Sequence, residues 1–66
     1  MHIIVNGGSV ECEAGTSLHG LIVQLGFKPE AVAAERNLEL VPGEDFSRTS
    51  LEEGDKVEIL HLVGGG

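Results

Sequence analysis

The residues best suited to chemistry stand at the end of the chain, where Val63 is followed by Gly64, Gly65 and Gly66. Because glycine has no Cβ, such an end can pass through a narrow channel and present its terminal carboxylate without steric hindrance. This carboxylate has an unperturbed pKa of about 3.5, so at neutral pH it is ionised and can attack an activated phosphate. Chain ends also fray when nothing ties them down. By itself, the tail is consistent with either a reactive carboxylate or a passive end.

The rest of the chain offers no second reactive set. The only cysteine, Cys12, lies in an alternating segment, where a free cysteine usually acts as a small buried hydrophobe. The acidic residues at 44–45 and 52–55 lack the ligand ladder of a calcium loop, and we expect solvated turns there. Three histidines are too widely spaced to match a zinc site: His2, His19 and His61. We therefore expect no catalytic residue, no metal and no bound cofactor in the folded body, and no enzymatic activity of its own.

Length and charge restrict the partners that the protein could have. The chain has 66 residues, 41% of them hydrophobic, and carries 11 acidic against 4 basic residues for a net charge of −7. Nucleic-acid binding is disfavoured, because it needs Lys and Arg to neutralise phosphates. A basic protein surface is the more natural partner, although the charge could also serve solubility alone. With no signal peptide and no apolar run that could span a membrane, we expect a cytoplasmic protein, monomeric on its own.

The first half of the chain predicts a hairpin followed by a helix. Two strand-like runs, 2–5 and 10–13, flank Asn6-Gly7, a strong signal for a tight β-turn. Thr16 and Ser17 can then cap a helix whose apolar residues share one face: Leu18, Leu21, Ile22 and Leu25. Gly26 fits the left-handed residue that commonly ends a helix, and Pro29 prevents easy continuation.

The second half predicts shorter strands and then one long strand. Residues 31–36 form a strand candidate with Val32 and Ala34 on one face, and Asn37 gives a turn before 38–41. Residues 42–45 are predicted to form a loop with Phe46 as an apolar plug beneath it. After the acidic turn at 52–55, residues 56–63 form the longest strand candidate.

This element order predicts an α+β protein with the β-grasp, or ubiquitin-like, architecture. The helix must cover one face of the sheet to bury its leucine and isoleucine side chains, and a last strand that returns beside the first runs parallel to it. We expect a mixed sheet of four to five strands with one main helix on one face. Residues 1–62 would form the folded domain and residues 63–66 a flexible glycine tail.

Strand alternation predicts an apolar patch on the face of the sheet away from the helix. If Ile3 packs under the helix, Ile4 points away from it. Glu58 must face water, so Leu60 and Leu62 share its outer side. We expect Ile4, Leu60 and Leu62 to lie together as a partner-binding surface, since exposed contiguous apolar area usually marks an interface. A bulge that turns Leu62 back over the core is the alternative.

Taken together, these features make the chain similar to the ThiS family of β-grasp sulfur carriers over essentially its full length. The resemblance rests on segments spread along the sequence: 3–7, 14–18, 21–26, 32–37, 40–42, 51–59 and 63–66. It implies that a ThiF-like adenylyltransferase uses ATP to adenylate the carboxylate of Gly66, with Gly64 and Gly65 threading the partner's active site. It further implies conversion of that carboxylate to a thiocarboxylate, which donates sulfur to the thiazole synthase ThiG in thiamin biosynthesis.

Two related functions remain as alternatives. A molybdopterin-synthase small subunit, a MoaD-like carrier, uses the same kind of tail, but such proteins are generally longer and tend to carry prolines before the final glycines. A ubiquitin-like modifier would begin with the same carboxyl chemistry and end in isopeptide bonds to lysine. An interaction module whose glycines only fray would keep its activity without Gly65 and Gly66.

Overall fold

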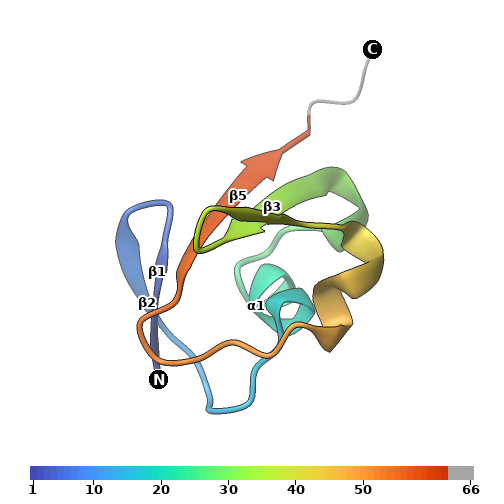
Figure 1. Ribbon diagram of the computed structural model, residues 1–66. Helices are drawn as coiled ribbons and strands as arrows, with labels where there is room; N and C mark the ends of the chain where they lie inside the picture. Colours follow the sequence, from blue (N-terminus) through green and yellow to red (C-terminus); the bar gives the residue numbers. More distant parts are fainter. Residues whose placement is uncertain (63–66) are drawn as a thin grey trace.

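The computed structural model describes residues 1–62, which form a five-stranded mixed sheet in the order β2-β1-β5-β3-β4 with a helix on one face (Figure 1). The strands are β1 (His2–Val5), β2 (Gly8–Glu11), β3 (Val32–Arg36), β4 (Glu39–Val41) and β5 (Lys56–His61). The helix is α1 (Leu18–Gln24), and two short 3-10 helices are η1 (Pro29–Ala31) and η2 (Gly43–Arg48). The predicted β-grasp fold is confirmed.

The opening hairpin forms around the predicted Asn-Gly turn. Asn6 and Gly7 have φ of 49° and 87°, the pair of positive values that a tight hairpin turn requires. Val5 pairs directly with Gly8, so the second strand begins and ends two residues earlier than predicted. The reason is that only Asn6 and Gly7 form the turn, so pairing with β1 already starts at Gly8. Cys12 follows this strand and is buried, as expected for a structural cysteine.

The helix begins at the predicted residue and ends at Gln24, so Leu25, predicted to lie on its apolar face, is the half-buried C-cap. Ser17 is the N-cap, and its side chain accepts a hydrogen bond from the backbone N–H of Gly20 at 3.0 Å. Gly26 follows the helix with φ of 88°, the left-handed conformation that glycine adopts without a steric penalty. Leu18, Leu21 and Ile22 are fully buried against the sheet, which confirms the predicted apolar face.

The region after the helix differs from prediction in detail. Ala31 belongs to η1 and the next strand starts at Val32, while Leu38 lies in the turn before β4. Residues 42–45, expected as a loop, lead into and form part of η2. Short acidic and polar stretches of this kind are compatible with 3-10 turns, which sequence periodicity does not reveal. Phe46 is buried in η2, so its predicted role as an apolar plug is confirmed.

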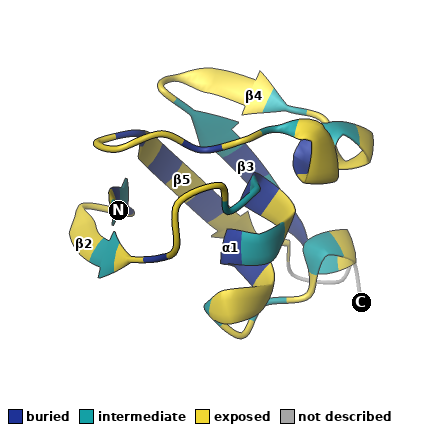
Figure 2. Cartoon of the chain, turned by 90° about the horizontal axis from the view of Figure 1, so that it is seen from below, coloured by how far each residue is buried: buried dark blue, intermediate teal, exposed yellow. Residues whose placement is uncertain are grey.

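The last strand occupies the centre of the sheet. β5 runs parallel to β1 on one side and antiparallel to β3 on the other, as expected for the parallel return. Figure 2 shows buried and exposed residues alternating along β5, with α1 packed against one face of the sheet. Five side chains at the middle of the core are fully buried: Ile3, Leu18, Leu21, Ile22 and Val57. The strand was predicted to reach residue 63, and it ends at His61.

Candidate functional site

β5 is the last strand before the predicted reactive tail. The backbone N–H of Leu62 donates to the carbonyl oxygen of Ala31 at 2.8 Å, so the last described residue is held beside the start of β3. The predicted site residues Gly64, Gly65 and Gly66 lie outside the described residues. The structure therefore describes the chain up to Leu62, and the boundary between residues 62 and 63 stays a prediction.

The outer face of β5 is apolar towards its end. Leu60 and Leu62 are 66% and 54% exposed, while Val57 and Ile59 are buried under the helix. This alternation places Leu60 on the side away from the helix, as predicted, and leaves no bulge between residues 57 and 60. Leu62 is exposed but follows the end of β5, so the side of the sheet on which it lies stays a prediction. Ile4 is half-buried on the same outer side of the sheet. The use of these residues as a partner-binding surface remains a prediction.

The expectation that Ile4 lies beside the two leucines is wrong. Ile4 pairs with Lys56, and Leu60 lies four residues further, roughly 13 Å along the strand. The reason is the hairpin turn: β1 ends at Val5 and reverses at Asn6 and Gly7 before it reaches the level of Leu60. Ile4 therefore belongs to a different part of the outer face.

The actual neighbours of Leu60 come from β3 and β4. Ala33 pairs with Leu60 across β3 and β5, and Leu40 pairs with Glu35 across β3 and β4. These residues surround an open hollow of about 210 Å³, which we call the outer groove. It is lined by Ala33, Ala34, Glu35, Leu40, Glu58 and Leu60. Sequence reasoning missed Ala33 and Leu40, although alternation along 32–36 already placed Ala33 on the outer side.

Two glutamates face each other within this groove. Glu35 of β3 pairs directly with Glu58 of β5. Like charges in directly opposite positions destabilise a sheet. Among residues 1–62, neither carboxylate takes part in an ion pair. The groove therefore combines exposed leucines with a concentrated negative charge.

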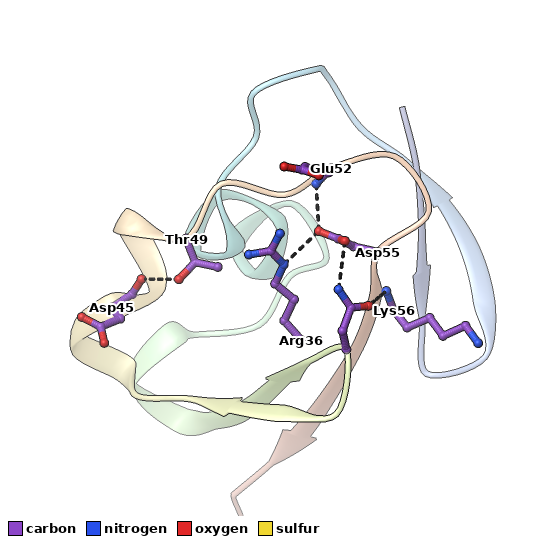
Figure 3. Close-up of polar contacts among 7 residues, drawn as sticks. Arg36, Asp45, Thr49, Glu52, Asp55 and Lys56 are labelled. Carbon is purple, nitrogen blue, oxygen red and sulfur yellow. Dashed lines mark hydrogen bonds and ion pairs between the residues drawn. The ribbon is translucent and has the colours of Figure 1, made fainter.

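A buried carboxylate fixes the start of β5. Asp55 accepts hydrogen bonds from Arg36 Nε at 3.0 Å, from Asn37 Nδ2 at 3.1 Å and from the backbone N–H of Glu52 at 2.8 Å (Figure 3). Burial raises the pKa of Asp55, but these three donors and the Arg36 charge outweigh it, so the net pKa lies below its ordinary value. The prediction of a wholly solvated acidic turn is therefore wrong at Asp55, because Arg36 and Asn37 reach it from a distant strand end.

Two asparagines hold β5 from both sides. The side chain of Asn6 accepts from the backbone N–H of Ile59 at 2.8 Å and donates to its carbonyl oxygen at 3.2 Å. The side chain of Asn37 accepts from the backbone N–H of Lys56 at 2.9 Å. Both asparagines have positive φ and stand where a neighbouring strand ends. Their amides thus continue the hydrogen bonding of β5 beyond those strands.

The other candidate groups stay apart. The ring of His61 lies 6.1 Å from that of Phe27, His19 is exposed on α1, and His2 contacts Glu53 at the opposite end of the sheet. Within residues 1–62, no group of three or more His, Cys, Asp or Glu side chains could hold a metal ion. Of the helices in that part of the chain, none has the length and apolar character needed to cross a bilayer.

Known proteins resemble this chain along its whole length. A family model described as the ThiS family matches residues 3–66. The sulfur carrier protein ThiS of Escherichia coli is 29% identical over 66 residues, and the match covers all of both chains. A crystal structure of the thiamine biosynthesis protein ThiS from Geobacter metallireducens superposes with a TM-score of 0.80 at 32% identity, also over the full length of both.

A second group of relatives is much longer. A thiazole synthase of Magnetococcus marinus is 46% identical over 66 residues, which is all of this chain but 20% of the synthase. A thiazole synthase of Paramagnetospirillum magneticum is 36% identical with the same coverage. The chain thus spans about a fifth of the length of these relatives.

Proposed function

The chain belongs to the ThiS family, and from this premise we propose that it is a sulfur carrier of thiamin biosynthesis that catalyses no reaction by itself. Its working group is the carboxylate of Gly66. The observation that carries the proposal is the family match, which extends through residue 66 and so includes the three glycines.

Activation of the carboxylate comes first. A carboxylate is a poor acyl donor, because its oxygen is a poor leaving group. A ThiF-like adenylyltransferase would let an oxygen of the Gly66 carboxylate attack the α-phosphorus of ATP, with release of pyrophosphate. A hydrosulfide ion would then attack the acyl carbon of the adenylate and expel AMP, which leaves a thiocarboxylate on Gly66 after loss of the sulfur-bound proton. Gly64 and Gly65 suit a narrow active-site channel, since neither carries a Cβ.

Delivery of the sulfur is the second step. The thiocarboxylate sulfur is anionic and polarizable, and beside glycine it is unhindered, so it is a good nucleophile towards the thiazole precursor. We infer that the acceptor enzyme is a thiazole synthase, ThiG, because sequences related to this chain form part of proteins with that name. Ile4, Leu60 and Leu62 would contribute to partner contacts. We place the carrier in the cytoplasm as a monomer that meets each partner in turn.

Intact-mass spectrometry tests the carrier chemistry. The purified chain is incubated with ATP, a ThiF-like enzyme and a sulfur donor. We expect a mass increase that corresponds to exchange of one oxygen for sulfur at the C-terminus. A matched variant that lacks Gly65 and Gly66 should stay unchanged, because its shortened end reaches less far into the partner.

Two results would contradict the proposal. One is an unchanged mass for the wild-type chain under conditions that charge the ThiS protein of Escherichia coli. The other is recovery of the chain from its own cells as isopeptide conjugates of high mass, which would identify a protein modifier instead.

A further inference from the structure

The tip of the β3–β4 hairpin carries a leucine where neither the backbone conformation nor burial favours one. Leu38 has φ of 72°, a left-handed conformation that bulky side chains rarely adopt. Its side chain is 90% exposed. Asn37 beside it has φ of 51°, but asparagine tolerates this region well. A tight hairpin turn favours glycine or asparagine at both positions, so the turn itself does not explain a leucine at 38.

The outer groove next to this hairpin also carries exposed leucines. Leu40, two residues after Leu38, is 69% exposed, and Leu60 faces it from β5 across the hollow. Exposed leucines gathered around a hollow are unusual on a free protein surface, and such patches generally mark interaction sites. The exposed leucine at the hairpin tip thus lies two residues from Leu40, which lines the outer groove.

The charge within the groove indicates the chemistry of the partner. Glu35 and Glu58 oppose each other between Leu40 and Leu60, and no cation of residues 1–62 neutralises them. A guanidinium between the two carboxylates would relieve their repulsion, since arginine can bond carboxylates through several N–H groups at once. An aliphatic or aromatic side chain beside that guanidinium would cover the leucines.

We propose that Leu38 and the outer groove form a docking surface for a basic protein partner, which inserts an arginine between Glu35 and Glu58 and an apolar side chain over Leu40 and Leu60. A second copy of this chain does not fit, because its net charge of −7 would oppose an equally negative surface. The partner we assign is the thiazole synthase, because relatives of this chain form part of proteins with that name; this assignment rests on the proposed function.

Binding measurements test the surface. Affinity of the full chain for the thiazole synthase of the same organism is measured by titration calorimetry for the wild type, Leu38→Asn and Glu58→Gln. We expect each substitution to weaken binding about tenfold, as for residues at the centre of an interface. Leu38→Asn should leave the melting temperature unchanged or raise it, because asparagine tolerates the left-handed turn. This separates a binding role from a structural one.

Matched controls use similar residues elsewhere. Val23→Ala removes an exposed apolar side chain from α1, on the opposite face of the sheet, and Glu11→Gln removes an exposed charge from β2. Both should bind like the wild type. Added salt should weaken wild-type binding more than Glu58→Gln binding, because the variant has lost one partner of the screened attraction.

Three outcomes would overturn the docking surface: no binding of the wild type to the synthase, variant affinities equal to the wild type, or wild-type dimers in sedimentation that Leu38→Asn abolishes. Charging of Gly66 is measured separately on the wild type. A charged wild type with unaltered variant affinities overturns only the docking surface. An uncharged wild type overturns the proposed function, while the affinities still decide whether this surface binds the synthase.

Discussion

Asp55 is a buried carboxylate that joins the end of β3, the turn at residues 52–55 and the start of β5. Its lowered pKa means that the folded state favours the ionised form. This contribution to stability is present above the unfolded pKa of about 3.9 and is lost as the pH falls through the lower folded value. The same network orients the strand that leads to the glycine tail.

Replacing Asp55 with asparagine should lower the free energy of unfolding at pH 7 by about 1.5–3 kcal/mol, the range for hydrogen bonds to a charged group. The amide NH₂ of the new asparagine would face the N–H donors of Arg36 or Asn37, so one hydrogen bond would be replaced by two opposed donors. Urea denaturation measures the loss. The difference from the wild type should shrink as the pH falls through the folded pKa of Asp55, where the wild-type carboxyl also becomes neutral.

Glu52→Gln is the matched control for this prediction. Glu52 contacts Asp55 through its backbone N–H, and its own side chain is exposed. We expect almost no change in stability from this substitution. A pH-independent difference between wild type and Asp55→Asn would refute the role of the carboxylate charge.

At the scale of elements, the central strand is longer than the first strand that pairs with it. β5 has six residues and β1 has four, so part of the β5 backbone extends past the end of β1. Asn6 fills this gap, because its side-chain amide bonds both the N–H and the carbonyl oxygen of Ile59. Asn6 thus helps to form the hairpin turn, and its side chain also holds the strand from which Leu60 projects.

Asn6→Gly should lower the free energy of unfolding by about 1–2 kcal/mol, since it removes two part-buried hydrogen bonds and keeps a residue that accepts positive φ. Asn6→Ala should cost about 1 kcal/mol more, because alanine is strained in the left-handed region. Chemical denaturation of both variants measures each contribution. Equal stability of Asn6→Gly and the wild type would show that the two side-chain bonds contribute nothing.

At the scale of the whole molecule, stability depends on a small core. A chain of 66 residues has a free energy of unfolding of about 3–10 kcal/mol at ordinary values per residue. The loss of one large core side chain can remove a large part of this free energy. The exposed apolar residues of the outer groove cannot compensate, because they are not buried in the free protein.

Leu21→Ala should therefore cost about 2–5 kcal/mol and leave the chain partly unfolded at 37 °C. Val23→Ala, on the same helix, should change stability by less than about 0.5 kcal/mol, because Val23 is 52% exposed. Thermal melts followed by circular dichroism compare the two. Similar melting temperatures for both variants would mean that the helix contributes little to the core.

Local signals in the sequence were sufficient for most of the fold. The Asn6-Gly7 turn, the Ser17 cap and the apolar spacing of the helix each depend on residues a few positions apart, and each is confirmed. Alternation along the last strand likewise predicted the exposure of Leu60 and Leu62. Such features are determined by backbone sterics and periodicity, which a single segment contains within itself.

The parts that sequence reasoning missed depend on which distant segments meet. Periodicity places Ile4 on the outer face, but only the pairing of β1 with the start of β5 separates it from Leu60 and puts Ala33 and Leu40 there instead. The burial of Asp55 likewise requires Arg36 to reach it from β3.

By itself, then, the sequence determined the element order, the faces of the strands, the net charge and the glycine end on which the proposed carrier chemistry rests. Only the tertiary structure decided the register between β1, β3 and β5, and with it the outer groove, the opposed Glu35 and Glu58 and the network around Asp55. The physical reason is that register is set by where hairpins turn and by which side chains pack across the sheet, and these contacts join residues far apart in the chain.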